Sequence, residues 1–430
     1  MNTSLDNLTH KMQRAALGKI VDVALSRAEQ DREKTMCQLV DAAKQFYGSG
    51  FSDETYENAK KVLTDPDSKW TKLINCVLDQ TDPHVARTTA LNLGYEAFFR
   101  GTKMIRENRV KYQCNIPWLI LFDPTSACNM HCVGCWAGEY GNKNNLSFED
   151  MDKIVTQGKE LGVYLYMLTG GEPLVRKNVA QLVAGLKATP GIRRVTLTTN
   201  AMLLAEQLSA LLDAGLDSVN ISLDTLRPEV FRQITARDDF AAVQAGLQAA
   251  LESGLPVKLN CVPQAGVNEG ELETLAALAK DNALQVRFIE MMPIGYGAAM
   301  PCISGPELRA RFARRWPELA PLSTAQEHAL GDGPAVYYTV PGWQGSIGFI
   351  AAVHGKFCAS CNRVRLTSQG FLRPCLASET GCDLRALLRS GADDAQLLAA
   401  IRETIWAKPR EHHFNDSSMP ATRGMYRIGG

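Results

Sequence analysis

The chain has 430 residues, and its 46 lysines and arginines balance its 46 aspartates and glutamates. At roughly 100–200 residues per domain, this length indicates two or three domains. A hydrophobic content of 45% with 21% charged residues excludes a mostly disordered chain, and zero net charge argues against a protein that coats nucleic acid. The residues Met1 to His10 are polar, and the apolar run Ile116–Phe122 is too short to span a bilayer. We therefore expect a cytoplasmic protein with no membrane and no nucleic-acid partner.

Residues 1–112 are predicted to form a helical N-terminal region. Asp82-Pro83 has the order of a helix N-cap followed by proline, and Ser52-Asp53-Glu54 is a similar helix start. Gly48-Ser49-Gly50 is expected to separate two helices. Because the region contains no cluster of chemically active residues, we interpret it as a helical cap or docking domain.

Residues 113–296 alternate between short apolar segments and longer helical ones such as Ser147–Leu161. Repeated strand–helix units predict a parallel sheet with crossover helices. Six such units indicate an α/β fold, a partial (β/α)6 TIM-like barrel, with the active site at the C-terminal ends of the strands. The expected strands are Trp118–Phe122, Val163–Leu168, Arg194–Thr199, Ser218–Leu223, Pro256–Val262 and Leu284–Glu290.

Half of the twelve cysteines fall in two tight groups. The first, Cys128, Cys132 and Cys135, has the spacing C-x3-C-x2-C and directly follows the first expected strand. Three thiolates on one loop can hold three irons of a 4Fe–4S cubane and leave the fourth iron open. A structural zinc ion is the alternative, but zinc usually takes four protein ligands and no fourth partner has a regular spacing here.

The less regular residues 297–430 contain the second group, with the spacing C-x2-C-x13-C, and form a predicted C-terminal iron–sulfur domain. The group again offers three thiols, Cys358, Cys361 and Cys375, and Cys382 is the candidate for a fourth ligand. Arg363 and Arg365 alternate, so in an extended segment both guanidinium groups face one side and suit an anion.

Polar and glycine motifs stand at the ends of the expected strands. Gly170-Gly171-Glu172-Pro173 follows the second strand, Thr198-Thr199-Asn200 closes the third, and Ser222-Leu223-Asp224 closes the fourth. Each motif by itself is typical of a turn. Their repeated placement on one rim of the barrel favours a role in binding a ligand.

The first cysteine group, together with Gly-Gly-Glu-Pro, resembles the radical S-adenosylmethionine (SAM) superfamily. The resemblance implies that the open iron chelates SAM and that the reduced cluster releases a 5′-deoxyadenosyl radical, which takes hydrogen from the substrate. The SAM contacts that it implies are Gly170, Gly171, Glu172, Asn200, Ser222 and Met292.

From Thr169 to Gly430 the chain resembles the GTP 3′,8-cyclase family of molybdenum cofactor biosynthesis. The matching segments are Val219–Leu226, Arg287-Phe288-Ile289-Glu290, Cys-x-x-Cys-Asn-Arg-x-Arg and the final Ile428-Gly429-Gly430. The resemblance implies a lyase that converts GTP to (8S)-3′,8-cyclo-7,8-dihydroguanosine 5′-triphosphate. The GTP contacts that it implies are Thr198, Lys258, Arg287, Arg363, Arg365, Gly429 and Gly430.

The N-terminal part departs from this pattern. The family generally has basic residues at three places where this chain has Leu121, Leu165 and Met167, and an aromatic residue where it has Gly134. Asn115–Lys177 is more similar to an unassigned radical SAM protein. A hydrogen bond to a charged group contributes roughly 1.5–3 kcal/mol, so three lost cations remove several kcal/mol of triphosphate binding.

These resemblances set the functional expectations. The cofactors are two 4Fe–4S clusters and SAM, and GTP is the substrate. The expected partners are a flavodoxin or ferredoxin as electron donor, the downstream cyclic pyranopterin monophosphate synthase and a second copy of the chain. The alternatives are a radical SAM enzyme for a peptide or small metabolite, with the N-terminal helices as a recognition domain, and a non-catalytic zinc-binding protein.

Overall fold

The computed structural model describes most of the chain. The described residues are 3–28, 31–47, 53–68, a few positions between 71 and 91, 102–114, 116–133, 135, 145–294, 297, 300–323, 330, 333–355, 357, 358, 361–378, 380–412 and 414. Among them, none of the helices combines the length and the apolar composition needed to cross a bilayer. The chain divides into two compact units, residues 1–107 and 108–430.

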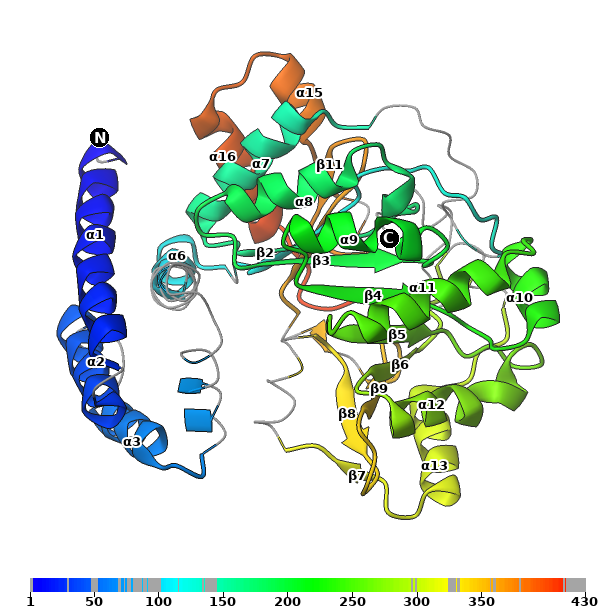
Figure 1. The fold of residues 1–430 in the computed structure, drawn as a ribbon. Helices are drawn as coiled ribbons and strands as arrows, with labels where there is room; N and C mark the ends of the chain where they lie inside the picture. The colour runs from blue at the N-terminus through cyan, green and yellow to red at the C-terminus, as the bar shows by residue number, and fades with distance from the viewer. Residues whose placement is uncertain are drawn as a thin grey trace. The chain divides into compact units, whose positions relative to one another are not determined.

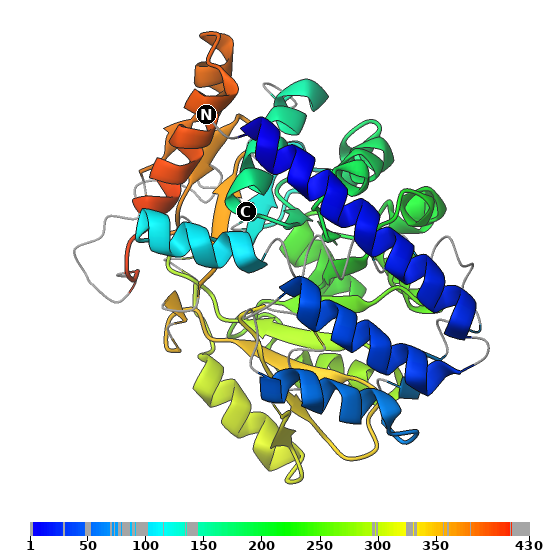
Figure 2. The same ribbon diagram turned by 90° about the vertical axis from the view of Figure 1, so that its left-hand side faces the viewer.

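The described residues of the first unit lie mainly in helices. Leu17 and Val21 of its first helix pack with Leu91 in a small apolar core. The division between the units falls inside α6, close to the predicted boundary at residue 112, while Asp82-Pro83 and residues 48–50 lie outside the described residues. Helices α1 (Thr3–Ala28), α2 (Arg32–Tyr47) and α3 (Asp53–Thr64) lie side by side in Figures 1 and 2. The next of the helices described here is α6 (Thr102–Tyr112).

Six parallel strands form the centre of the second unit, and they neighbour one another in chain order. This confirms the α/β fold and the partial barrel. The strands are β1 (Leu119–Phe122), β2 (Leu165–Leu168), β3 (Arg194–Thr199), β4 (Ser218–Ser222), β5 (Val257–Cys261) and β6 (Gln285–Ile289). The crossover helices along one face of the sheet (Figure 1) are α7 (Phe148–Leu161), α8 (Val179–Ala188), α9 (Leu204–Asp213), α10 (Pro228–Thr235), α11 (Phe240–Glu252) and α12 (Leu272–Asp281), and η4 (Pro173–Val175) and η5 (Glu269–Glu271) are short turns.

The C-terminal region extends this sheet at both edges. Strand β10 (Arg363–Leu366) pairs in parallel with β1, and β9 (Ser346–Ile350) pairs in parallel with β6. As a result, the segments around the second cysteine group belong to the same sheet as the barrel. The other elements of this region are α13 (Gly305–Arg315), β7 (Ala320–Pro321), β8 (Val336–Thr339), β11 (Phe371–Arg373), β12 (Cys382–Asp383), α15 (Leu384–Arg389) and α16 (Asp394–Trp406).

Helix α7 illustrates how the sequence determines these elements. Ser147 caps its first turn by accepting from the Asp150 N–H, and Gly162 ends it in the left-handed conformation with φ of 106°. Met151, Ile154 and Leu161 form its buried stripe. The carboxylate of Asp150 also accepts two bonds from the Arg389 guanidinium, which ties α7 to the C-terminal helices across 239 residues.

Candidate active site

A cavity of about 290 Å³ is enclosed by the barrel strands and by β10. Because side chains alternate between the two faces of a strand, each strand contributes every second residue to this cavity. Thr198, Asn220 and Lys258 occupy neighbouring positions across β3, β4 and β5 and all line it. The amide N–H of Asn220 donates to the Thr198 hydroxyl at 3.1 Å, so this row of polar groups is linked.

Five lysine and arginine side chains line the cavity. Arg194 comes from the start of β3, and the other four, called the four cations below, are Lys258 and Arg287 of the central strands and Arg363 and Arg365 of β10. Burial lowers the pKa of Arg287, Arg363 and Arg365, because a guanidinium loses hydration inside the protein. An anion that enters the cavity would offset this cost.

The guanidinium of Arg287 is held in place by two asparagine side chains. Its Nε–H donates to Asn260 at 2.8 Å and its NH2 group donates to Asn220 at 2.9 Å. Arg287 is 7% exposed. Its fixed position suits a group that orients a ligand rather than a solvated surface charge.

All three cysteines of the second group line the same cavity. The ring of Phe357, directly before Cys358, lies 5.6 Å from the Arg363 guanidinium. Cys382 pairs with Leu372 in the β11–β12 ladder and does not line the cavity. The structure therefore brings Cys358, Cys361 and Cys375 together with the four cations and leaves the candidate fourth ligand outside this set.

Lys408 lies against the second cysteine group, and the sequence contained no signal for it. Its ammonium donates to Cys361 Sγ at 3.4 Å and to the Arg363 carbonyl at 2.5 Å. Burial opposes ionisation of Cys361, but the charges of Lys408 and Arg363 outweigh it and lower the pKa of the thiol. Lys408 therefore stabilises the thiolate form, which is the form that binds iron.

The first cysteine group lies on a loop held by backbone bonds. The N–H groups of His131 and Val133 donate to the carbonyls of Thr235 and Ile234 at 3.1 and 2.7 Å, which fastens the loop to the end of α10. Burial raises the pKa of Cys128 to about 11 and that of Cys132 still further. Iron binding must therefore displace protons from these thiols.

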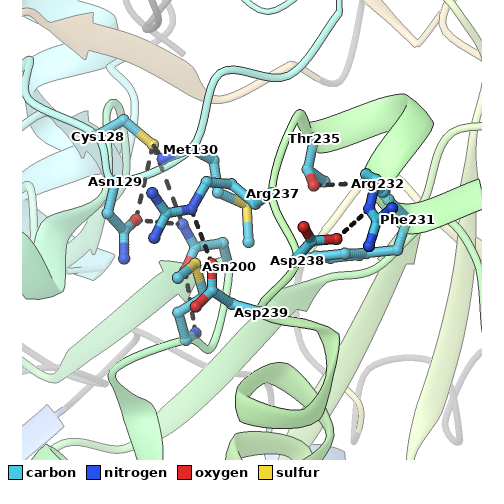
Figure 3. A network of polar contacts seen from close by, with 11 residues as sticks. Cys128, Asn129, Met130, Asn200, Phe231, Arg232, Thr235, Arg237, Asp238 and Asp239 are labelled. Atoms are coloured by element: carbon cyan, nitrogen blue, oxygen red, sulfur yellow. Dashed lines mark hydrogen bonds and ion pairs between the residues drawn. The ribbon is translucent and has the colours of Figure 1, made fainter. Parts of the chain in front are cut away.

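Figure 3 shows the polar contacts beside this loop. The amide of Asn200, at the end of β3, donates to the Asn129 side chain at 2.7 Å and lies 4.0 Å from Cys128 Sγ. Arg237 lies beside them and donates to Asp239 at 2.8 Å. Asn200 thus stands next to the first cysteine group.

The glycines after β2 are required by the fold itself. Gly170 and Gly171 have φ of 72° and 52°, in the left-handed region. A Cβ atom on Gly171 would stand 2.4 Å from the Ala127 carbonyl oxygen, directly before Cys128. One on Gly170 would stand 2.2 Å from Asp123. The two glycines therefore let the loop after β2 pack against the segment that leads into the first cysteine group.

Glu172 is buried and faces the end of β3. Its carboxylate accepts from the Thr199 hydroxyl and the Asn200 N–H, each at 2.7 Å, and from the Leu174 N–H at 3.0 Å. Burial raises its pKa to about 7 even though these bonds oppose the shift. In this structure its hydrogen bonds join the loop after β2 to the Thr-Thr-Asn motif.

The remaining predicted positions are distributed around the site. Met292 lines the cavity, and Ser222 is exposed at the C-terminal end of β4. Gly429 and Gly430 lie outside the described residues. Asn260 and His412 line the cavity but were not predicted. Asn260 is two residues after Lys258 in β5, so both side chains lie on the same face of the strand. This alternation could have predicted Asn260 from the sequence.

Comparison with known proteins agrees with this arrangement. Residues 122–279 match the Radical SAM superfamily and residues 284–414 match Molybdenum Cofactor Synthesis C. Fold and site therefore define the class of radical SAM proteins with a C-terminal domain of molybdenum cofactor synthesis.

Comparison with individual relatives identifies the family within this class. A GTP 3′,8-cyclase of Heliobacterium modesticaldum is 41% identical, over 71% of this chain and 95% of its own. Those of Moorella thermoacetica and Gloeobacter violaceus are 40% and 42% identical, over 71% and 70% of this chain and 95% and 96% of theirs. The chain belongs to the GTP 3′,8-cyclase family. The aligned share exceeds the segment from Thr169 to Gly430, so the similarity reaches into the preceding part of the barrel.

The cofactors of this family are two 4Fe–4S clusters and SAM. The cysteine groups are therefore interpreted as cluster ligands and not as a structural zinc site. The residues present fit them, since the second group offers three thiols around one cavity and the first offers three on one tethered loop. Among the described residues, no three His, Cys, Asp or Glu side chains converge on a single metal ion.

Glu290 fixes the loop that leads to the second cysteine group. Its buried carboxylate accepts from the N–H groups of Val353 and His354 at 2.7 and 3.0 Å, from Gly305 N–H at 3.2 Å, and contacts the His354 ring. Glu290→Gln turns one acceptor into a donor that faces these N–H groups. We expect a loss of about 2–4 kcal/mol of unfolding free energy and a lower iron content, measured by denaturation and iron analysis.

The pH dependence of this effect has a defined sign. Burial opposes ionisation of Glu290, but the bonds from His354 and Val353 outweigh it and hold its pKa below the usual value. The stabilisation is therefore complete above the usual glutamate pKa of about 4.3 and is lost as the pH falls below it. We expect the cost of Glu290→Gln to shrink as the pH falls below about 4.3. A cost that does not shrink there would show that another group controls the loop. His354→Ala, which keeps both backbone N–H donors, is the milder matched control.

We expect Lys408→Met to lower the reduction potential of the second cluster. The loss of a positive charge and of a hydrogen bond to a ligand sulfur disfavours the added electron, by on the order of 50 mV. A redox titration followed by electron paramagnetic resonance measures the shift, and Lys408→Arg should retain most of the wild-type potential. An unchanged potential in Lys408→Met would mean that the ammonium only supports the backbone at Arg363.

Proposed function

We propose that the chain is a radical SAM GTP 3′,8-cyclase, a lyase that converts GTP to (8S)-3′,8-cyclo-7,8-dihydroguanosine 5′-triphosphate in molybdenum cofactor biosynthesis. One observation carries the proposal: the second cysteine group and four cationic side chains line a single cavity. A cluster with an open iron and a set of cations together suit a ligand that has both a heteroaromatic base and phosphates.

The two cysteine groups and the cavity lining have different roles in this reaction. Cys128, Cys132 and Cys135 would hold the cluster that, when reduced, transfers one electron to SAM and thereby supplies the 5′-deoxyadenosyl radical. That radical would take the C3′ hydrogen of the ribose and leave as 5′-deoxyadenosine. C3′ would then bond to C8 of guanine, and one further electron from the reductant and a proton at N7 would complete the 7,8-dihydro product. Gly171, Asn200, Ser222 and Met292 would contact SAM, and the second group, Cys358, Cys361 and Cys375, would hold the substrate cluster. The cavity wall orients the nucleotide through Thr198 and the four cations. We assign no acid–base pair, since radical chemistry of this kind does not require one.

The test is an anaerobic assay of the reconstituted protein with SAM and a reductant, with and without GTP. We expect 5′-deoxyadenosine to form in step with the cyclised nucleotide and to depend on GTP. Cleavage of SAM that is indifferent to GTP would reject the substrate and favour a radical SAM enzyme for a peptide or small metabolite. Full iron loading without SAM cleavage would reject the enzyme assignment.

The partners follow from this chemistry. One electron is needed to start each cycle, so we propose a flavodoxin or ferredoxin as the donor. The product would pass to a cyclic pyranopterin monophosphate synthase, and the enzyme would act in the cytoplasm as a homodimer. Reduction of the first cluster by a purified flavodoxin, and the mass of the protein in solution, test the first and last of these proposals.

A further inference from the structure

Arg194, the first residue of β3, brings a fifth cation to the cavity lining. In the register of the sheet it lies opposite Leu165 of β2, and Leu119 of β1 lies between Leu165 and Arg363 of β10. Each of the four is the first residue of its strand, so they form one row along the N-terminal edge of the sheet. The two ends of this row are cationic and its middle is apolar.

Within the described part of the chain, no hydrogen bond or ion pair holds the guanidinium of Arg194. Asp217, directly before β4, lies beside the start of β3, but its carboxylate is already engaged. It accepts from Lys187 Nζ at 2.9 Å and from the Val195 N–H at 2.7 Å. In this respect Arg194 differs from Arg287, whose guanidinium donates to two asparagine side chains.

The described residues that line the cavity include no aspartate and no glutamate. The lining therefore carries excess positive charge. Negative charge from the second cysteine group would arise beside β10, because Cys361 is two residues before Arg363. Because an unpaired charge inside a protein is costly, a ligand gains free energy when it brings an anionic group to Arg194.

The position of Arg194 defines the shape of this ligand. Cys358 and Cys361 belong to the segment that joins β9 to β10, whereas β3 is three places from β10 and four places from β9 in the sheet. Three strand spacings of about 4.8 Å separate the backbones of Arg194 and Arg363 by about 14 Å along the sheet. A ligand that binds at the second cysteine group and also contacts Arg194 must be elongated, with its negative charge at the far end.

We propose that Arg194 binds the distal end of the substrate's phosphate chain and thereby selects a nucleoside triphosphate over a monophosphate. The inference rests on the proposed function and assigns one further specificity-determining residue to its site. The base lies at the second cysteine group, and the phosphate chain extends from there toward β3. Arg194 also replaces the cation that the family generally has at the position of Leu165, one strand further along the same row.

The first test measures the binding of GTP and of GMP by calorimetry, with reconstituted protein and without SAM, so that no turnover occurs. We expect Arg194→Met to bind GTP at least about tenfold more weakly than the wild type, since a hydrogen bond to a charged group is lost. GMP does not extend to Arg194, so its affinity should change by less than about twofold. Unchanged binding of GTP, or equal weakening of GTP and GMP, would overturn the inference.

Arg193→Met is the matched control. Arg193 is the preceding residue, its guanidinium lies 5.8 Å from the centre of the Tyr164 ring, and it is not among the residues that line the cavity. This variant should bind both nucleotides like the wild type. Arg194→Lys keeps the charge, and we expect it to have an intermediate affinity for GTP. An affinity no higher than that of Arg194→Met would overturn the role of the charge.

Arg194 is only partly buried, so we expect Arg194→Met to fold. Retained iron content and circular dichroism qualify the variant. Arg194→Gln, which keeps a polar side chain, is measured alongside it with the same expected loss of GTP affinity. In whichever variant folds, a selective loss of GTP binding supports the inference, and unchanged GTP binding overturns it.

The second test separates this inference from the proposed function. Inorganic triphosphate, which lacks the base and the ribose, should bind to Arg194→Met at least about tenfold more weakly than to the wild type. The value of kcat/KM for the cyclised product from GTP should fall by a similar factor. If the wild type does not cyclise GTP but binds triphosphate through Arg194, the proposed function fails and the phosphate site stands. If Arg194→Met cyclises GTP with the wild-type kcat/KM, the proposed function stands and the inference is overturned.

Discussion

Cys361→Ser should abolish cyclisation of GTP, and with it the GTP-dependent cleavage of SAM, while the first cluster is retained. Cys361 lines the cavity together with Cys358 and Cys375, and Lys408 and Arg363 lower the pKa of its thiol. With one of three thiolates removed, the second cluster no longer assembles, and the iron content should fall from about eight to about four per chain. We expect product formation to decrease by more than about a thousandfold, because the cluster is part of the substrate site.

Cys382→Ser is the matched control for this experiment. Cys382 lies in the short strand β12 and pairs with Leu372, away from the cavity. The variant should keep its full iron content and its activity. Loss of iron in Cys382→Ser would establish Cys382 as the fourth ligand of a closed cluster. Full cyclisation by Cys361→Ser would contradict the role of the second cysteine group in substrate binding.

Arg287→Met should reduce kcat/KM for GTP by about a hundredfold, or about 2.7 kcal/mol of transition-state stabilisation. The variant removes a buried guanidinium from the cavity and leaves the side chains of Asn220 and Asn260 without their donor. A hydrogen bond to a charged group contributes roughly 1.5–3 kcal/mol, which is the size of the expected effect. Steady-state kinetics of the cyclised product measure it.

Two further variants show whether the reduced kcat/KM of Arg287→Met is due to the loss of this buried charge and its hydrogen bonds. Arg309→Met removes an exposed arginine that donates to the Tyr338 hydroxyl and does not line the cavity, and it should be active like the wild type. Arg287→Lys keeps the charge but cannot reach both asparagines in the same way, so we expect an intermediate value. If Arg287→Met keeps its wild-type kcat/KM, the four cations do not act together on the nucleotide.

The sequence by itself determined the class of protein. Cys128, Cys132 and Cys135 are close in the chain, so their spacing on one loop could be interpreted without knowledge of the fold. The alternation of Arg363 and Arg365, and the strand–helix repeat of the barrel, are likewise local patterns, and the structure has β1 to β6 where the repeat predicts strands. Such signals depend on backbone periodicity, which neighbouring residues specify.

Only the tertiary structure decided how the walls of the cavity are composed. The parallel pairing of β10 with β1 joins residues more than 240 positions apart and places Arg363 beside Leu119. Lys408 at Cys361, and Glu172 at the end of β3, are contacts of the same long-range kind. No local pattern encodes them, because they result from sheet register and helix packing, in which free energy is gained by many distant residues together.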